Sequence, residues 1–382
     1  MNSIVNINSF RAGTFRQMND YKAFIPATIN HGWKWNDTEI NTLLEKASSE
    51  LGSLSAFSDL IPNIDIYIAM HIKTEANKSN KIEGTKTSIE EDLMPIEDVS
   101  PEKRDDYQEV HNYIIALNYG IERIVDNDFP LCNRLICEIH RHLLQGVRGK
   151  HKTPGEFRKS QNWIGGSKPS DAVYVPPSVI DLPELLSDFE KFINNDNLNV
   201  PYLIKVAILH YQFETIHPFL DGNGRIGRLV IPLFLLSKGL LSKPCFYISD
   251  YFESHRAEYY DALNRVRTHD DLSSWIKFFL NAVIATAQAA KNKFHAVTEY
   301  VREVEDRALA LGGRPDNILK VVRAFYDNPV LSVNNIVKIT GIKKGTVENT
   351  INRLYDAKII GEVTGYSRNR MYILYDYLKL YA

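Results

Sequence analysis

Apolar residues recur at helical spacing along most of this chain. Residues 37–51, DTEINTLLEKASSEL, carry an apolar residue every three or four positions, behind Asn36 or Asp37 as the N-cap. The same spacing predicts further helices over 63–79, 103–125, 130–144 (opened by Pro130), 182–194, 200–216 and 225–240, two more from about 252 onward, and a long polar one over 289–310. We therefore expect a mainly α-helical protein.

Two segments lack this spacing. Residues 1 to about 30 are rich in Asn and irregular, and we expect an extended arm there. Residues 150–178 are rich in Pro, Gly and Ser and contain one short alternating run, AVYV. A loop of this length inside a compact domain is usually functional or disordered.

The C-terminal part is expected to form a separate module, because residues 311–317, LGGRPDN, have the composition of a linker. A helix over 319–326 is followed by a helix, a turn at Gly341, a second helix and a two-stranded wing that turns at Gly365. This order resembles a winged helix-turn-helix. The domains expected are 1–100, a helical region; 101–311, the core; and 312–382, the module.

The C-terminal module carries an excess of positive charge. Residues 313–382 contain 11 Lys and Arg against 6 Asp and Glu, whereas the rest of the chain contains 34 against 41. The side chains expected to face outward on the second helix are those of Lys343, Lys344, Thr346, Asn349 and Arg353. DNA binding is one interpretation of this surface, and a protein-contact or homodimer module is equally compatible with it.

The composition is that of an ordinary soluble globular protein. With 382 residues, 44% hydrophobic and 24% charged, the chain suits two or three domains. A net charge of −2 gives the whole chain no general affinity for polyanions. Three cysteines without CxxC spacing argue against a disulfide framework or zinc cluster. No secretion-signal pattern opens the chain, and no apolar run approaches the ~20 residues of a membrane span. We expect a cytoplasmic protein outside the membrane.

One stretch concentrates the candidate chemistry. HPFLDGNGRIGR, from His217 to Arg228, lies between two apolar helical segments. Glycines ahead of a helix leave amides free to face a ligand, and the helix N-terminus, Arg225 and Arg228 add positive charge, which suits phosphate. His217 can take a proton beside that phosphate. Asp221 offers the hard oxygen ligand that Mg²⁺ prefers.

Two other interpretations of this stretch are weaker. A Gly-rich turn between two core helices explains the glycines, but not the histidine and the arginines together. A metal site on His210 and His217, two turns apart, lacks a third ligand at suitable spacing. His210 is more simply a packing residue. His140 and His142 are two apart and cannot share a helical face, so they receive no chemical role.

The stretch resembles the signature of the Fic family, HPFx(D/E)GNGRxxR, at every specified position. The resemblance implies a Fic-fold helical core with a β-hairpin flap. It also implies a protein adenylyltransferase, which moves AMP from ATP to a hydroxyl side chain of a target protein and releases pyrophosphate. His217 is then the catalytic base. The nucleotide site implied comprises Asp221, Gly222, Asn223, Gly224, Arg225, Ile226, Gly227, Arg228 and Tyr259.

The resemblance implies further roles within the loop. The amides of Gly222, Asn223 and Gly224 would stabilise charge on the transferred phosphate. Asp221 would hold Mg²⁺ between phosphates, and the Asn223 side chain would orient the phosphate. Phe219 would pack the loop onto the core.

The resemblance also suggests which residues contact the adenine ring and which contact the target protein. Tyr259 best matches the aromatic residue that lines the family's adenine pocket; Tyr260 can exchange with it, and core packing is a competing role. The elements PGEFR and VYVPP resemble the Fic flap, a β-hairpin whose edge accepts the target's backbone. The flap residues are Asp171, Ala172, Val173 and Tyr174. An ordinary surface hairpin is the alternative.

A second motif is SNKIEGT, residues 79–85. Ser79, Glu83 and Gly84 match the (S/T)xxxE(G/N) pattern of Fic proteins that inhibit themselves. The match implies that Glu83 pairs with Arg228, the cation that the γ-phosphate of ATP also needs. A helix capping box, or a surface acid before a turn glycine, is the alternative.

Other functions stay open at this point. Related Fic proteins transfer a different phosphate ester, or remove AMP with the help of the inhibitory glutamate. A DNA-binding regulator whose Fic core only senses nucleotide is a second class. The expected partners are a target protein, ATP and Mg²⁺, with self-modification and a homodimer as further options.

Overall fold

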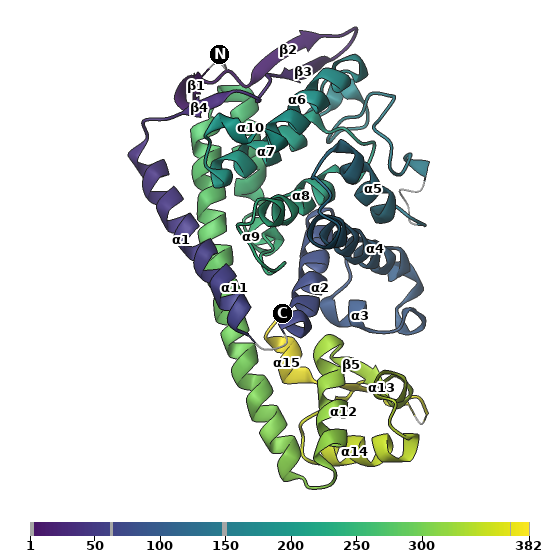
Figure 1. Cartoon of the computed structure of the whole chain (residues 1–382). Coiled ribbons are helices and arrows are strands. Elements are labelled where there is room, and N and C mark those ends of the chain that lie inside the picture. The colour runs from purple at the N-terminus through teal and green to yellow at the C-terminus, as the bar shows by residue number, and fades with distance from the viewer. Residues whose placement is uncertain (1–3, 62–63, 147–150, 367, 382) are drawn as a thin grey trace.

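The computed structural model describes residues 4–61, 64–146, 151–366 and 368–381 (Figure 1). The ends of some predicted segments, at residues 1–3, 63, 150 and 382, lie outside these ranges. Helices dominate, as the sequence predicts. The longest, α11 (Leu272–Ala310), runs along one side of the molecule down to the C-terminal module (Figure 1).

The N-terminal segment forms paired strands instead of the expected extended arm. β1 (Ile4–Asn6) runs parallel to β4 (Gly32–Lys34), and β2 (Gly13–Gln17) is antiparallel to β3 (Lys22–Pro26). Phe24 of this segment is buried in the core. Strands this short have too few residues to give a recognisable alternating pattern.

The first helix begins where its cap predicts. The carboxylate of Asp37 accepts hydrogen bonds from the amides of Glu39 and Ile40, and α1 (Thr38–Leu60) follows. α1 continues past the predicted end and packs along α11 (Figure 1). α11 is one helix over a region that the sequence divided into two, because no strong breaker interrupts it.

The centre of the molecule is a pair of helices, α7 (Tyr202–Ile216) and α8 (Asn223–Ser237). Every residue of α7 after Tyr202 is buried. The neighbouring helices are α2 (Ile64–Ile82), α4 (Arg104–Ile121), α5 (Asn133–Leu143) and α6 (Leu182–Asn194). α11 is tied to the pair by Trp275, whose indole N–H donates to the Ala207 carbonyl at 2.8 Å. The loop between α7 and α8 therefore starts and ends on a rigid base.

Shorter elements complete the core. They are α3 (Ile89–Leu93), α9 (Ser249–Ser254), α10 (Arg256–His269), a π-helical turn (Glu122–Asp126) and the 3₁₀ turns Ile7–Ser9, Ile96–Asp98, Pro101–Lys103, Pro169–Asp171, Val179–Asp181 and Asp196–Leu198.

Two details of the helix boundaries differ from the prediction. Pro130 does not open α5, which begins at Asn133 behind Cys132. α8 begins at Asn223, two residues before the predicted start, because Gly222 adopts a left-handed conformation that ends the loop. Asn223 and Gly224 therefore belong to the first turn of α8.

The C-terminal module contains the elements that its sequence predicts. α12 (Pro315–Asp327) precedes the helices α13 (Val333–Thr340) and α14 (Lys344–Asp356), which are separated by Gly341 in a left-handed conformation. β5 (Val330–Ser332), β6 (Gly361–Glu362) and β7 (Met371–Ile373) form an antiparallel sheet in the order β5-β7-β6, and α15 (Tyr375–Lys379) follows. The assignment as a winged helix-turn-helix stays a prediction.

The outer surface of α14 agrees in part with the prediction. Lys343, Lys344, Thr346 and Asn349 are exposed. Arg353 is different, because its guanidinium donates to the carbonyl of Leu311 and so faces the linker. Within the described residues, no helix has the length and apolarity that crossing a membrane requires.

Candidate active site

The loop between α7 and α8 reverses direction at two left-handed residues. His217 (φ 49°, ψ 60°) ends α7, and its amide donates to the Phe213 carbonyl at 2.9 Å. Gly222 (φ 78°) precedes α8, and a Cβ there would lie 3.3 Å from Leu143. Glycine has no penalty in this conformation, which explains its use at the point where the loop meets the helix.

Asn223 holds the loop in shape. Its side-chain oxygen accepts from the Phe219 amide and its side-chain nitrogen donates to the Phe219 carbonyl, both at 2.8 Å. Phe219 is fully buried and stacks on His140 at 3.8 Å between ring centroids, which confirms its packing role. These two bonds give the Asn223 side chain a structural role in the loop, and its predicted role in orienting phosphate stays a prediction.

Two residues that the sequence analysis did not identify hold the loop by hydrogen bonds to its backbone carbonyls. The buried Arg158 donates from Nε to the His217 carbonyl at 3.0 Å, and Asn162 donates to the carbonyls of His217 and Phe219 at 3.1 and 2.7 Å. Arg158 is the arginine of the PGEFR element. Its place in that element was the only signal in the sequence.

His217 has the chemical state that a general base needs. Its Nδ1 lies 3.4 Å from the Glu214 carbonyl, which can only accept, so the Nδ1 proton points there and Nε2 keeps its lone pair. Burial lowers the pKa of His217 to about 4, and the hydrogen bond to Glu214 opposes that shift. The imidazole is therefore neutral at physiological pH.

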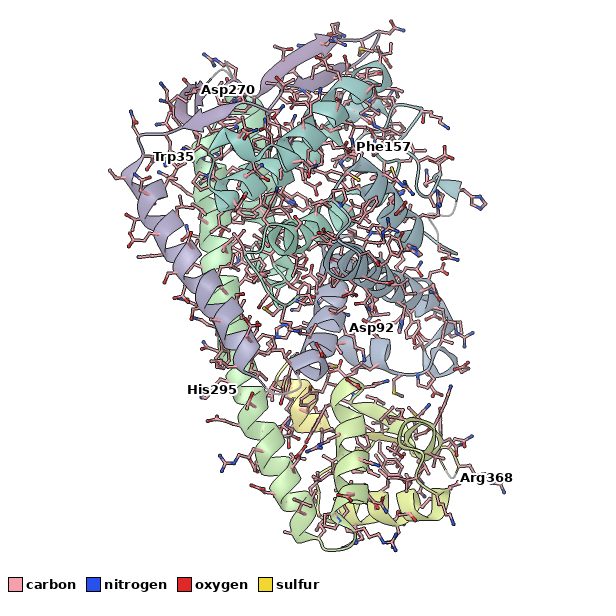
Figure 2. All side chains as sticks on the ribbon, viewed as in Figure 1. Trp35, Asp92, Phe157, Asp270, His295 and Arg368 are labelled. Carbon is pink, nitrogen blue, oxygen red and sulfur yellow. The ribbon has the colours of Figure 1, made fainter. Side chains whose placement is uncertain are left out.

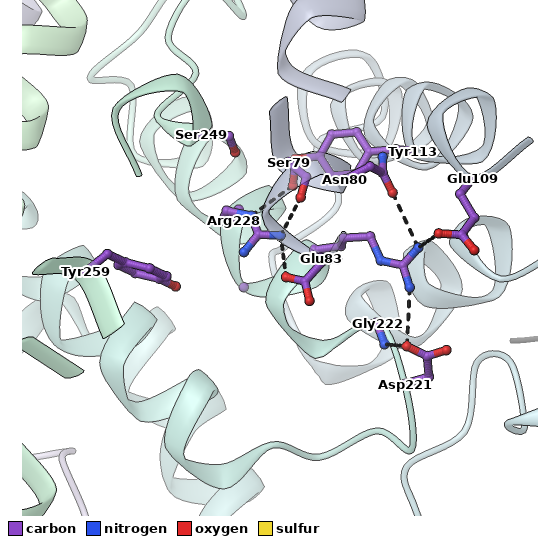
Figure 3. A network of polar contacts seen from close by, with 12 residues as sticks. Ser79, Asn80, Glu83, Glu109, Tyr113, Asp221, Gly222, Arg228, Ser249 and Tyr259 are labelled. Atoms are coloured by element: carbon purple, nitrogen blue, oxygen red, sulfur yellow. Dashed lines mark hydrogen bonds and ion pairs between the residues drawn. The ribbon is translucent and has the colours of Figure 1, made fainter. Parts of the chain in front are cut away.

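Arg228 meets the inhibitory motif as the sequence predicts (Figure 3). Its Nε donates to Ser79 Oγ at 2.9 Å, and one terminal nitrogen donates to the Ser79 carbonyl at 2.9 Å and to Glu83 Oε1 at 2.7 Å. Arg228 is 1% exposed, whereas a third of the Glu83 side chain, 33%, reaches solvent. These two motifs, distant in sequence, form one polar network.

The Glu83 carboxylate lies over the first turn of α8. A Cβ on Gly224 would come 2.4 Å from Glu83 Oε1, so glycine leaves the space that this carboxylate occupies. The first amides of a helix have no partner within the helix and attract anions. Burial raises the pKa of Glu83, but the charges of Arg228 and Arg225 outweigh burial and lower it, so Glu83 is ionised there.

The end of α2 sets the position of Glu83. Gly84 has φ 101°, and the amides of Glu83, Gly84 and Thr85 donate to carbonyls in the last turn of α2. Ser79 lies inside α2 and accepts from Arg228, so the capping-box alternative is wrong.

Arg225 and Asp221 form the outer part of the site. Arg225 donates to Glu109 at 3.1 Å, Asn80 at 3.4 Å and Asp221 at 3.3 Å. Asp221 also accepts from the Gly222 amide at 2.6 Å, so that amide is committed and its predicted role at the phosphate is not supported. The side chain of Asp221 is 40% exposed.

The site fits Mg²⁺ only as a metal that arrives with its substrate. Among the described residues there is no group of three His, Cys, Asp or Glu side chains able to hold a metal ion. Mg²⁺ commonly takes one or two carboxylates plus substrate phosphates. A single half-exposed carboxylate, that of Asp221, matches this pattern.

Three predicted nucleotide residues face the core instead. Ile226 is 1% exposed, and a Cβ on Gly227 would come 2.3 Å from Glu214 Oε1, so both pack against α7 and neighbouring helices. Tyr259 is 1% exposed and stacks on Phe252 at 4.4 Å. These contacts favour core packing, the competing role, for Tyr259.

Tyr260 is the aromatic residue near the site that remains accessible. It is 44% exposed, and burial together with the charge of Glu83 raises its pKa. Tyr259 instead hydrogen-bonds through its OH to His210 Nε2 at 2.9 Å, while His210 Nδ1 lies 3.1 Å from the Gly227 carbonyl. Both nitrogens of His210 have partners, so the metal alternative is wrong.

The predicted flap has little β-structure. A single antiparallel bridge joins Ile164 to Tyr174, in place of a β-hairpin. Tyr174 is buried, and its OH donates to the Thr215 carbonyl at 2.6 Å, so it anchors the loop on α7 and does not face a target. Asp171 ends a 3₁₀ turn and accepts from Ser167 and Lys168. Ala172 follows this turn, and Val173 is 79% exposed.

Comparison with known proteins identifies both motif regions. Residues 130–235 match the model of the Fic/DOC family, and residues 41–122 match that of the Fic/DOC family N-terminal region. The chain is 32% identical over 212 residues to "Protein adenylyltransferase Fic" of Aedes aegypti and 31% identical over 210 residues to that of Culex quinquefasciatus. Each match covers 54% of this chain and 39% of the relative, so the chain spans about two fifths of their length.

Solved structures agree in fold. A Fic family protein from Desulfovibrio desulfuricans G20 superposes with a TM-score of 0.56 at 22% identity, over 88% of this chain and 96% of that one. A Fic domain containing signaling protein from Bacteroides thetaiotaomicron superposes with a TM-score of 0.53 at 22% identity, over 66% of this chain and 95% of that one.

The first prediction concerns the charge of His217. Its imidazole should stay neutral on titration from about pH 8 to pH 5, because its pKa lies near 4. The folded pKa is below the ordinary value of about 6.5, so stability falls as the pH drops between those two values. NMR of the imidazole nitrogens, with His217→Asn to assign the signal, measures this. A midpoint near pH 6.5 would contradict it.

The second prediction concerns the two hydrogen bonds between the Asn223 side chain and the Phe219 backbone. Asn223→Ala leaves the buried amide and carbonyl of Phe219 short of one partner each and should lower the free energy of unfolding by about 1–3 kcal/mol. Urea unfolding measures the loss. Asn281→Ala, which removes an exposed hydrogen bond to a helix carbonyl, is the control and should stay within about 0.5 kcal/mol of the parent. Equal losses of stability in the two variants would contradict the stabilising role of Asn223.

Proposed function

Since this chain belongs to the Fic/DOC family, we propose that it is an ATP-dependent protein adenylyltransferase. It transfers AMP to a Ser, Thr or Tyr hydroxyl of a target protein and is inhibited by its own Glu83. The observation that carries the proposal is the Glu83 carboxylate bound to Arg228 at 2.7 Å over the first turn of α8, in the loop that His217 opens. An internal anion occupies a phosphate-type site there.

The nucleotide's phosphates bind at the N-terminus of α8. The amides of Asn223 and Gly224 lie in its first turn and are oriented toward an anion by the helix. Arg228 adds a charge that burial keeps in one position. Asp221 would hold Mg²⁺, which supplies neutralisation of phosphate charge when bound. Tyr260, in place of Tyr259, is our candidate for contact with the adenine ring of ATP.

His217 accepts the proton of the target hydroxyl on Nε2. The hydroxyl oxygen forms a bond to the α-phosphorus, the bond from that phosphorus to the bridging oxygen breaks, and pyrophosphate leaves with the electron pair. The lowered pKa of His217 keeps Nε2 unprotonated before the reaction. Arg158 and Asn162, which bind the His217 carbonyl, are positioning residues for this step.

Inhibition follows from competition for one guanidinium. Three hydrogen bonds tie Arg228 to Ser79 and Glu83. A γ-phosphate that binds Arg228 must displace the Glu83 carboxylate, because both are anions that need the same donors. ATP then binds poorly or in an unproductive alignment while Glu83 stays in place.

Exposed regions suggest where the target protein and further partners bind. The loop around Val173 is our candidate for contact with the target. A hollow of about 540 Å³ on the C-terminal module, lined by Lys344, Arg368 and Arg370, supports DNA as a second ligand (Arg368, Figure 2). Self-modification and a homodimer remain further proposals. Removal of AMP, or transfer of another phosphate ester, is the alternative activity, which comparison of α- and γ-labelled ATP separates.

The third prediction is release of inhibition. Glu83→Gly should raise the transfer of AMP to protein, including this protein itself, by about tenfold or more, because Arg228 becomes free for the γ-phosphate. Incorporation of label from α-labelled ATP measures it. Glu90→Gly, which removes an exposed glutamate from α3, is the control and should match the parent. A parental or lower rate in Glu83→Gly would argue against inhibition.

The fourth prediction concerns the base. In the Glu83→Gly background, His217→Ala should lower the transfer rate by about 10²–10⁴-fold, the usual contribution of a general base. ATP affinity, measured by calorimetry, should change by less than about twofold, because His217 is assigned to the hydroxyl and not to the phosphates. His295→Ala, an exposed histidine on α11, should leave both values unchanged. Transfer at the parental rate would overturn the assignment.

A further inference from the structure

A second cavity, of about 180 Å³, lies beside the inhibitory helix. It is bordered by α2, α9 and α11, and α2 contributes His71, Glu75 and Lys78 from one face. Ser79, which binds Arg228, lies in the last turns of the same helix, and Glu83, which also binds Arg228, follows directly after the helix ends at Ile82. The space exceeds that of a single water molecule many times, so it admits a small organic molecule or ion.

Three polar atoms around this cavity lack partners. His71 Nε2, Tyr247 OH and Thr286 Oγ1 are buried and, within the part of the chain described, have no hydrogen bond. The residues His71 and Tyr247 are only 8% and 7% exposed. Burying such groups without a hydrogen-bond partner is unfavourable, because each loses its bonds to water and gains none in return. Three such atoms, from α2, from the segment before α9 and from α11, border one cavity, which indicates a ligand that supplies the missing partners.

The charges on the cavity wall favour an anion. Lys78 already pairs with Asp250 at 2.8 Å and with Glu253 at 3.8 Å. Glu75 is occupied by three donor groups, the Tyr113 hydroxyl and the hydroxyl and amide of Ser249. Lys293 also lines the cavity, and among the described residues no carboxylate forms a salt bridge with it. Its ammonium lies over the Tyr381 ring, 5.5 Å from the ring centroid. Burial lowers its pKa, and the more distant charge of Asp250 opposes that shift.

We propose that this cavity binds a small oxyanion, a carboxylate or a phosphate, with Lys293 as its charge partner. The hydroxyls of Tyr247 and Thr286 donate to the remaining oxygens of the anion. His71 donates from Nε2, because burial lowers its pKa to about 3 and a neutral imidazole still carries one N–H. Charge-assisted hydrogen bonds of this kind are the strong ones in proteins.

The ligand would also act on α2. Its site exists only while α2 lies against α9 and α11, so binding favours that arrangement and, through it, the contact of Glu83 with Arg228. Glu75 links the two regions, because it accepts hydrogen bonds from Tyr113 and Ser249. Figure 3 shows Tyr113 and Ser249 beside the Arg228 network. This regulatory consequence rests on the proposed function, whereas the binding itself does not.

Calorimetry on the intact protein tests the site. Sodium phosphate and sodium acetate are titrated separately, against sodium chloride at the same ionic strength, and saturable heat is expected from at least one of the two oxyanions. Lys293→Met should weaken that binding by about tenfold or more. Lys291→Met, on the same helix but paired with Glu50, is the control and should bind as the parent does.

The results distinguish a phosphate ligand from a carboxylate ligand and show whether the site exists. Phosphate binding alone points to a phosphate ligand, and acetate binding alone points to a carboxylate; either supports the site. No saturable binding of either ion, or binding that Lys293→Met leaves unchanged, as expected for an anion held at Arg228, would overturn it.

Hydrogen exchange gives a readout that does not depend on AMP transfer. The amides of Glu83, Gly84 and Thr85 donate to carbonyls at the end of α2. With the oxyanion bound, they should exchange several-fold more slowly. Unchanged exchange would overturn the link to Glu83. Failure of the Glu83→Gly prediction, in contrast, would count against the proposed function while leaving this binding result intact.

Discussion

A buried guanidinium that needs an anion is the constraint on which this molecule depends. Arg228 is 1% exposed and lies among the central helices, where an uncompensated charge would cost several kcal/mol. Ser79 supplies two acceptors, and Glu83 supplies the negative charge. Burial alone would lower the pKa of Arg228, but the negative charge of Glu83 and of neighbouring groups outweighs burial and raises it, so Arg228 is ionised. Any ligand that removes Glu83 must therefore bring an anion of its own, which a nucleotide triphosphate does.

The rest of the fold serves this exchange. α7 and α8 form a rigid buried pair, and Asn223 clips the loop between them, so the anion site keeps its shape with or without Glu83. Glu83 lies outside this pair of helices, in the turn directly after α2, and a third of its side chain is exposed to solvent. The cation, Arg228, is therefore held in one position, whereas the internal anion, Glu83, lies just beyond the end of α2. This division suits a site in which one anion replaces another.

Sequence reasoning identified the parts that local pattern determines. Helical spacing gave the order of the helices, and the two motifs gave the pairing of Glu83 with Arg228, because each motif contains charges whose partners are few. It failed where packing decides. Tyr259 and Tyr260 are adjacent, and which one faces the core depends on Phe252 and His210. The short N-terminal strands, the partner of Asn223 and the burial of Tyr174 likewise depend on contacts between segments distant in sequence.

Competition for Arg228 is tested most directly by comparing two nucleotides that differ in the γ-phosphate. Calorimetry with ATP and with AMP on the parent and on Glu83→Gly measures four affinities. If Glu83 occupies the place of the γ-phosphate, its removal tightens ATP binding by about tenfold or more and changes AMP binding by less than about twofold. Equal tightening of both nucleotides, or no tightening of ATP, would contradict the competition.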